Sequence, residues 1–469
     1  MIHKDIAKII EGVISITDGR FEVVDNEKLK QIIDSLVYKA TFGDNDIQAS
    51  ARYVIWETAL SLNITPTSIN NFYMARGAEK IPLNFTVPAI NLRAITYDMA
   101  QQIFKVAKKR NIGPFTFELA RSEMKYTDQT PMEYSISIMA AAIKTDWSGA
   151  LFIQGDHFQS KAKSIGVPLE GEMESIKALA KDAISAGFYN IDIDMSTLVD
   201  LDKPTVEEQQ VPNIENTLEL ATYIRSIEPE GITISLGGEI GHIGGKNSTE
   251  EDLDAYMQGF NKKFRGVGLS KISVQTGTHH GGVVLPDGTL KKLPVDFNVL
   301  STLSKIAREK YGMAGAVQHG ASTLPDEYFK HFASTTAIEI HFATGLQNLI
   351  LDHPKFPKDL LERMYAWIDK EKSEERNPDQ TDEQFHYKLR KKAIKPFKKE
   401  LWDLDHQIKE DIMKSLKERL EFLFGTLNIS DTLELLNQKV KPIKIHKELK
   451  DFYKESNVVK TISTKGLSD

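Results

Sequence analysis

From residue 85 onward, short runs of β-branched and aromatic residues alternate with longer amphipathic stretches. The runs are expected to be strands at residues 85–91, 115–119, 150–155, 190–195, 232–236, 271–276, 315–318 and 337–342. Stretches between them, such as TYDMAQQIFKVAKKR and EMESIKALAKDAISAG, carry apolar residues at the spacing of one helical face. This alternation is typical of parallel strands joined by crossover helices. We therefore expect an α/β fold, a TIM (β/α)8 barrel, with an open doubly wound sheet as the alternative.

Helical additions are expected on both sides of the barrel. Residues 1–80 contain two amphipathic segments, EKLKQIIDSLVYKATFG and DIQASARYVIWETALSL, which predict a helical N-terminal extension. Residues 355–469 are highly charged and have helical spacing, and they predict a charged helical C-terminal region. The catalytic barrel is then expected to span residues 81–354.

Composition narrows the chemistry and the partners. The formal net charge of -7 gives no general attraction to nucleic acid. The chain has no apolar run long enough to span a membrane, and its start, MIHKDIAKIIEG, has no small-residue cleavage site. We therefore expect a cytoplasmic protein with no nucleic-acid or membrane partner. Because there are 0 cysteines, any transition metal must be held by His, Asp and Glu.

Polar residues gather where the expected strands end. In chain order they are Asp156 and His157, Asp192 and Asp194, Glu239, His279 and His280, His319, and His341. A single histidine at a strand end is usually structural, but barrel enzymes build their sites from several strand ends. Glycine-rich segments (GGEIGHIGG, GTHHGG, QHGAS) accompany these residues. The pattern favours a histidine-rich divalent-metal site that keeps an open coordination position.

Five segments resemble, in order, motifs of the class II (zinc-dependent) fructose- and tagatose-bisphosphate aldolases. They are GDH at 155–157, IDMS at 193–196, GGEIGHIGG at 237–245, GTHHG at 277–281 and QHGASTLPDE at 318–327. The resemblance implies His157, His280 and His319 as ligands of Zn²⁺ or another divalent cation. It implies Asp194 and Glu239 for an alternative or second cation position, and Asp156 for proton transfer. Since neighbouring residues of a strand face opposite ways, we expect Asp156 to point away from His157 or into the loop.

The resemblance also implies substrate-binding residues. Gly281, Gly320, Ser322 and Thr344 would form a phosphate pocket, and His341 stands where the family has a substrate-binding Asn. YKLR at 387–390 resembles the family's Tyr-Asp-Pro-Arg, whose arginine reaches a substrate phosphate across a subunit boundary, so Arg390 is a candidate. A homo-oligomer is implied in the same way.

The function implied is that of a carbon–carbon lyase of carbohydrate metabolism, as in glycolysis. It would cleave a ketose (bis)phosphate such as fructose 1,6-bisphosphate to dihydroxyacetone phosphate and an aldehyde. Retro-aldol cleavage leaves negative charge on an enediolate, which a divalent cation stabilises.

Some features depart from the family. The family's long acidic loop is shortened here to KNSTEEDLDAY, in which Glu250 and Glu251 resemble the first turn of a helix. His341 and the acidic residues Glu118 and Glu123 at the second strand end also differ. The YTDQTP stretch resembles an accessory aldolase subunit. A metal-dependent aldolase or epimerase on another or non-phosphorylated sugar, and a non-catalytic accessory subunit, therefore remain as alternatives.

Overall fold

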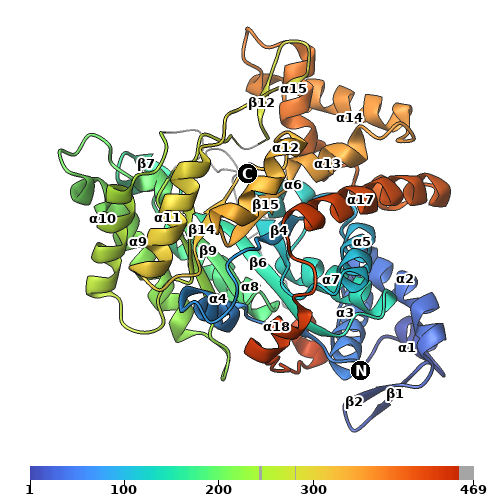
Figure 1. Ribbon diagram of the computed structural model, residues 1–469. Coiled ribbons are helices and arrows are strands. Elements are labelled where there is room, and N and C mark those ends of the chain that lie inside the picture. Colours follow the sequence, from blue (N-terminus) through green and yellow to red (C-terminus); the bar gives the residue numbers. More distant parts are fainter. Residues whose placement is uncertain (242–245, 280, 454–469) are drawn as a thin grey trace.

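Eight parallel strands close into a barrel (Figure 1) in the computed structural model, which describes residues 1–241, 246–279 and 281–453. The strands are β4 (Val87–Asn91), β5 (Thr116–Ala120), β6 (Gly149–Gln159), β9 (Asn190–Asp194), β10 (Ser235–Glu239), β11 (Lys271–Val274), β14 (Ala316–Gln318) and β15 (Glu339–Phe342). The last strand pairs with the first over residues 339–342 and 87–90. This closure confirms the TIM barrel and excludes the open sheet.

Helices surround the barrel, and most follow the amphipathic stretches of the sequence. They include α5 (Thr96–Lys109), α6 (Arg121–Thr127), α7 (Pro131–Lys144), α8 (Glu172–Ser185), α9 (Val206–Ser226), α10 (Glu250–Lys263), α11 (Phe297–Glu309), α12 (Asp326–Phe332) and α13 (Thr344–Leu351). Glu250 and Glu251 lie in the first turn of α10, as expected, behind the N-cap Thr249. Two short hairpins, β7 (Ala162–Ser164) with β8 (Val167–Pro168) and β12 (Val283–Val284) with β13 (Leu290–Lys291), follow β6 and β11.

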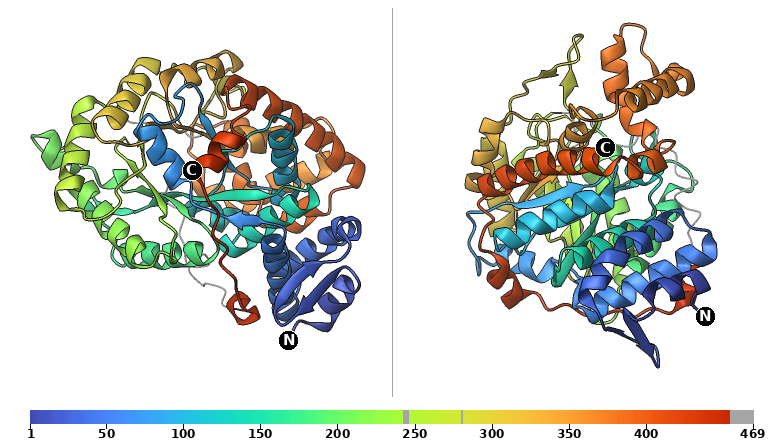
Figure 2. Two further views of the ribbon diagram at one scale, coloured as in Figure 1. Left: turned by 60° about the horizontal axis from the view of Figure 1, so that its bottom comes forward. Right: turned by 90° about the vertical axis from the view of Figure 1, so that its right-hand side faces the viewer.

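Most of the N-terminal region packs beside the barrel (Figure 2), while its last helix contacts α11. Its helices are α1 (Lys4–Ile10), α2 (Asn26–Phe42), α3 (Asn45–Ser61) and α4 (Asn70–Gly77), and α2 and α3 contact α7. The sequence did not predict its hairpin, β1 (Ile14–Thr17) with β2 (Arg20–Val23), or strand β3 (Ile64–Pro66). Because β3 pairs with residues 149–151, the start of β6, this region meets the barrel away from the strand ends that carry the chemistry.

The C-terminal region is helical, with α14 (Lys358–Glu371), α15 (Asp382–Leu389), α16 (Lys398–Trp402), α17 (His406–Thr426) and α18 (Leu433–Lys439). The long helix α17 lies against α5 and α13. Within the described ranges, none of the helices combines the length and apolarity needed to cross a membrane.

The ammonium group of Lys271, on β11, lies inside the barrel and contacts side chains of three other strands, β6, β9 and β15. Lys271 Nζ is 2.9 Å from Asp192 Oδ1, 2.6 Å from Glu339 Oε2 and 2.9 Å from Gln154 Oε1. Burial opposes charge here, but the two carboxylates outweigh it and raise the pKa of Lys271 above its usual value. Burial likewise opposes ionisation of Glu339, yet Lys271 lowers the pKa of this carboxyl to about 2. Lys271 therefore remains cationic.

Replacing Lys271 with methionine is expected to destabilise the fold strongly. The carboxylate of Asp192 would remain buried without its cation and Glu339 would keep only His341 as a cationic partner, at a cost of about 3–5 kcal/mol in the free energy of unfolding. Urea unfolding followed by circular dichroism measures this loss. Lys263→Met, which removes an exposed pair with Glu215, serves as the control and should cost at most about 1 kcal/mol. Equal stability of the two variants would contradict the structural role of Lys271.

Candidate active site

A register irregularity in β6 brings the side chains of the neighbouring residues Asp156 and His157 close together. Pairing with β9 shifts between Gly155 and Phe158, and His157 has φ 42°. Its Nε2 then lies 3.8 Å from Asp156 Oδ1. Gly155 permits the shift because a Cβ there would collide with the Phe158 ring. The sequence placed Asp156 on the opposite face of the strand from His157 or in the loop. Regular strand alternation does not hold across this bulge, so the two side chains approach to 3.8 Å although only Asp156 lines the adjoining cleft.

Two histidines and a glutamate form a compact group at the strand ends. His157 Nε2 is 2.8 Å from His319 Nδ1, and Glu239 Oε2 is 3.4 Å from His157 Nδ1. One ligand atom from each of the three residues lies within 4.8 Å of the others. Ser273 Oγ, 2.9 Å from Nε2 of His319, orients that ring. His280 lies outside the described residues, so its predicted place beside this group stays a prediction.

Asp194 lies behind His157. Its Oδ2 is 3.0 Å from His157 Nδ1 and accepts a hydrogen bond of 2.5 Å from Gln159 Nε2, while Oδ1 accepts one of 3.0 Å from the Ser196 backbone N–H. A carboxylate behind a histidine fixes its tautomer and frees the other ring nitrogen to bind a metal. Asp194 and Glu239 thus face the same ring nitrogen of His157, Nδ1, and Asp194 is the nearer of the two.

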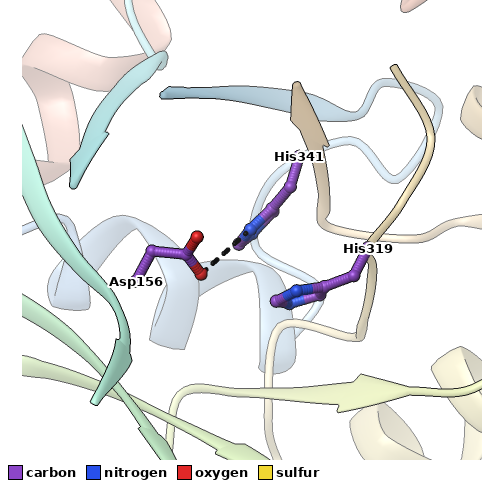
Figure 3. Close-up of side chains that lie close together, drawn as sticks. All are labelled: Asp156, His319 and His341. Atoms are coloured by element: carbon purple, nitrogen blue, oxygen red, sulfur yellow. Dashed lines mark ion pairs between the residues drawn. The ribbon is translucent and has the colours of Figure 1, made fainter. Parts of the chain in front are cut away.

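Asp156, His319 and His341 converge in the mouth of the barrel (Figure 3). Asp156 Oδ1 is 3.5 Å from His341 Nδ1, and the rings of His319 and His341 are 4.1 Å apart. Burial alone would favour the neutral acid, but the histidines, His157 first, lower the pKa of Asp156 well below its usual value. Asn91 Nδ2 donates to Asp156 Oδ2 over 3.0 Å. Asp156 is thus an ionised, fixed carboxylate that can accept a proton.

His341 is held between carboxylates. Its Nδ1 is 3.2 Å from Glu118 Oε2 and its Nε2 is 3.1 Å from Glu339 Oε2. Although burial lowers the pKa of His341, Glu118 and its acidic neighbours raise it to about 10. The side chain is therefore an imidazolium at neutral pH, unlike the neutral Asn that the family places here.

A cleft beside this group gathers most of the predicted phosphate-binding residues. Its lining residues are Asn91, Arg93, Asp156, Gly281, His319, Gly320, Ser322, His341, Ala343 and Thr344. Arg390 is not among them, since both of its terminal nitrogens bind Asp352, at 2.5 and 2.8 Å. Asn91 and Arg93 were not predicted, although Asn91 ends the first strand, Arg93 follows it by two residues, and the strand-end rule would have found them.

The fold and this strand-end group define a (β/α)8 barrel with a His- and carboxylate-lined site, and comparison with known proteins identifies its family. The family model of class-II fructose-bisphosphate aldolase matches residues 78–421. The chain therefore belongs to the class II fructose-bisphosphate aldolase family, whose chemistry is that of a lyase. A search of curated proteins found no match.

The solved structures that this chain matches include aldolases. One is a fructose-bisphosphate aldolase from Campylobacter jejuni, 16% identical, covering 77% of this chain and 94% of its own, with a TM-score of 0.45. Another is the YdjI aldolase from Escherichia coli K12, 13% identical, covering 78% of this chain and 98% of its own, also with a TM-score of 0.45.

Proposed function

We propose that the chain is a divalent-metal-dependent aldolase that cleaves a ketose phosphate, such as fructose 1,6-bisphosphate, to dihydroxyacetone phosphate and an aldehyde. The observation that carries the proposal is the position of ionised Asp156 beside the His157, Glu239 and His319 group. The same cleft contains the hydroxyls of Ser322 and Thr344, which suit a phosphate.

The residues present fit a divalent cation. His157, His319 and Glu239 would hold it, with His280 as a further ligand by family resemblance, and nitrogen and carboxylate donors suit Zn²⁺. Asp156 Oδ1 and His341 Nδ1, which lie 3.5 Å apart, are both buried next to this group. When bound, the cation supplies polarisation of the substrate carbonyl.

The chain's own residues would supply proton transfer and orientation. Asp156 would take the proton from the substrate hydroxyl whose carbon loses its bond to the neighbouring carbon, and would return it in the condensation direction. Asn91 holds this carboxylate in place over 3.0 Å. Asp194 would fix the tautomer of His157. The imidazolium of His341, with both ring nitrogens beside carboxylates, would place a positive charge next to Asp156.

A second candidate is a metal-dependent aldolase or epimerase acting on another sugar. It is favoured by the pair of His341 with Glu118, 3.2 Å apart, which puts a cation where the family has an amide. Such a change bears on which sugar hydroxyls are bound rather than on the metal group. Product analysis by nuclear magnetic resonance separates an epimerase from either aldolase, because an epimerase conserves the carbon chain and an aldolase divides it, and the sugar that is cleaved separates the two aldolases.

Metal content and cleavage test the proposal together. Elemental analysis of the purified chain is paired with cleavage of fructose 1,6-bisphosphate, coupled to reduction of dihydroxyacetone phosphate, with and without chelator. Bound zinc with chelator-sensitive cleavage is the expected result. Bound metal without cleavage would overturn the assignment of fructose 1,6-bisphosphate as the substrate. The second candidate function or an accessory role would then remain. A chain that binds no divalent metal would overturn the proposal itself.

Metal affinity is expected to rise steeply with pH. Burial, followed by Asp194, raises the pKa of Glu239 to about 8, and the neighbouring carboxylates outweigh burial to raise the pKa of His157. Both groups must lose protons to bind a cation, so affinity should grow roughly tenfold per pH unit for each proton released. Chelator competition from pH 6.5 to 8.5 measures it. With unshifted groups the affinity would already level off near pH 7, and that profile would contradict the prediction.

A further inference from the structure

Arg93 lies in the cleft between two strand ends that flank its own. It follows β4 by two residues, and β4 has β5 and β15 as neighbours in the barrel. Arg93 Nε donates to Glu123 Oε1, beyond β5, over 2.5 Å. One terminal nitrogen donates to Thr344 Oγ1, beyond β15, over 3.0 Å. The guanidinium is thereby held in one orientation.

The Arg93 and Glu123 pair is fully enclosed, with side-chain exposures of 1% and 0%. Burying two charges carries a large desolvation penalty, and such a pair gives little net stability compared with apolar side chains. Arg93 lines the cleft whereas Glu123 lies behind it, which points to ligand binding as the function of the arginine. Arginine suits this role because its planar fork matches the oxygens of a phosphate.

Other donors in the cleft surround the same space. Ser322 and Thr344 supply hydroxyls, and both Gly281 and Gly320 have positive φ, 71° and 65°. A Cβ on Gly320 would lie 3.0 Å from the His279 backbone oxygen, so the turn admits no side chain there. Donors that approach from several strand ends suit a tetrahedral phosphate better than a planar carboxylate.

The pair is also connected to the proton-transferring residue. Glu123 Oε2 accepts hydrogen bonds from the Ala120 backbone N–H, at 2.8 Å, and from Asn91 Nδ2, at 2.9 Å. Asn91 Nδ2 also donates to Asp156 Oδ2 over 3.0 Å. Arg93, Glu123, Asn91 and Asp156 thus form one continuous row of polar contacts across the barrel mouth.

We propose that Arg93 determines substrate specificity by binding a phosphate group of the substrate, and that Glu123 positions it. The proposal rests on the proposed function and deepens it, because it assigns the recognition of phosphate to a buried guanidinium of the same chain. The row through Asn91 would then set the position of Asp156 relative to the anchored substrate.

Calorimetric binding to the zinc-loaded full chain tests the proposal with three probes: dihydroxyacetone phosphate, dihydroxyacetone and the carboxylate analogue hydroxypyruvate. Arg93→Gln is expected to reduce the preference for dihydroxyacetone phosphate over dihydroxyacetone about 10- to 100-fold, the loss typical of a hydrogen-bonded charge. Arg93→Lys should retain part of that preference, and Glu123→Gln should reduce it with Arg93 still present. Thermal unfolding checks that each variant is folded.

Arg121→Gln is the matched control, because Arg121 is equally buried and is 2.5 Å from Glu172 but does not line the cleft. Its preference should equal that of the unaltered chain. An unchanged preference in Arg93→Gln, or an equal loss in Arg121→Gln, would overturn the proposal. Tighter binding of hydroxypyruvate than of the phosphate would overturn the choice of phosphate.

The cleavage assay separates this proposal from the proposed function. Arg93-dependent binding of dihydroxyacetone phosphate by a chain that cleaves no ketose phosphate would leave the anion site standing and overturn the aldolase. If the Arg93→Gln variant cleaves fructose 1,6-bisphosphate with an unchanged KM, the aldolase function would stand and the role of Arg93 in phosphate binding would be overturned.

Discussion

Replacing His319 with alanine is expected to abolish metal binding and cleavage together. His319 lies 2.8 Å from His157 and belongs to the group that would hold the cation, so its loss removes an imidazole donor. Because a bound metal contributes several kcal/mol to transition-state stabilisation, kcat/KM should fall by at least about 1,000-fold. Elemental analysis and the coupled cleavage assay on the same preparation measure both effects.

The matched control for this variant is His353→Ala. His353 is 3.1 Å from Ser415 and belongs to none of the candidate metal groups, so its loss should leave the metal content and rate unchanged. His319→Ala protein that retains full metal content would refute the ligand assignment, and retained activity without metal would refute the role of the metal.

Replacing Asp156 with asparagine is expected to separate metal binding from turnover. The amide keeps the size of the side chain but cannot accept a proton as the carboxylate does, so kcat should fall about 100- to 10,000-fold. Metal content should stay near that of the unaltered chain because His157, His319 and Glu239 remain. Steady-state kinetics and elemental analysis give the two readouts.

Asp254→Asn is the control for this loss of charge. Asp254 forms an ion pair of 2.7 Å with Lys310 and does not line the cleft, so its replacement should not change kcat. A near-normal rate in Asp156→Asn would exclude Asp156 as the proton acceptor, whereas loss of metal in that variant would make it a ligand instead.

The barrel could be predicted because its signal is local and repeated. Each strand and helix carries its own periodicity, and the strand-end rule then selects Asp156, His157, Glu239, His319 and His341 without knowledge of their distances. The same rule, applied to the first strand, would have reached Arg93. The sequence could not predict which side chains pair with each other. Arg390, for example, bonds to Asp352, and no shared motif links these two residues.

Strand boundaries failed where a strand breaks the usual composition. β10 was expected at 232–236 but runs from Ser235 to Glu239. The prediction ended too early because glycine, found here at Gly237 and Gly238, is uncommon in strands. Gly237 is required there, since a Cβ would collide with Asp192. β6 was expected to end at 155 but continues through the bulge to Gln159, because pairing with β9 resumes at Phe158.

The backbone at His157 also limits how this site can change over evolutionary time. With φ 42°, the residue occupies a conformation that His, Asp and Asn adopt more readily than other residues with side chains, while glycine, which adopts it freely, has no ligand atom. Glutamate and cysteine, which bind metals well elsewhere, are strained at this position. A change of metal preference by substitution at this position is therefore limited to very few side chains. The backbone conformation, and not only the chemistry of the metal, restricts which ligands can occur here.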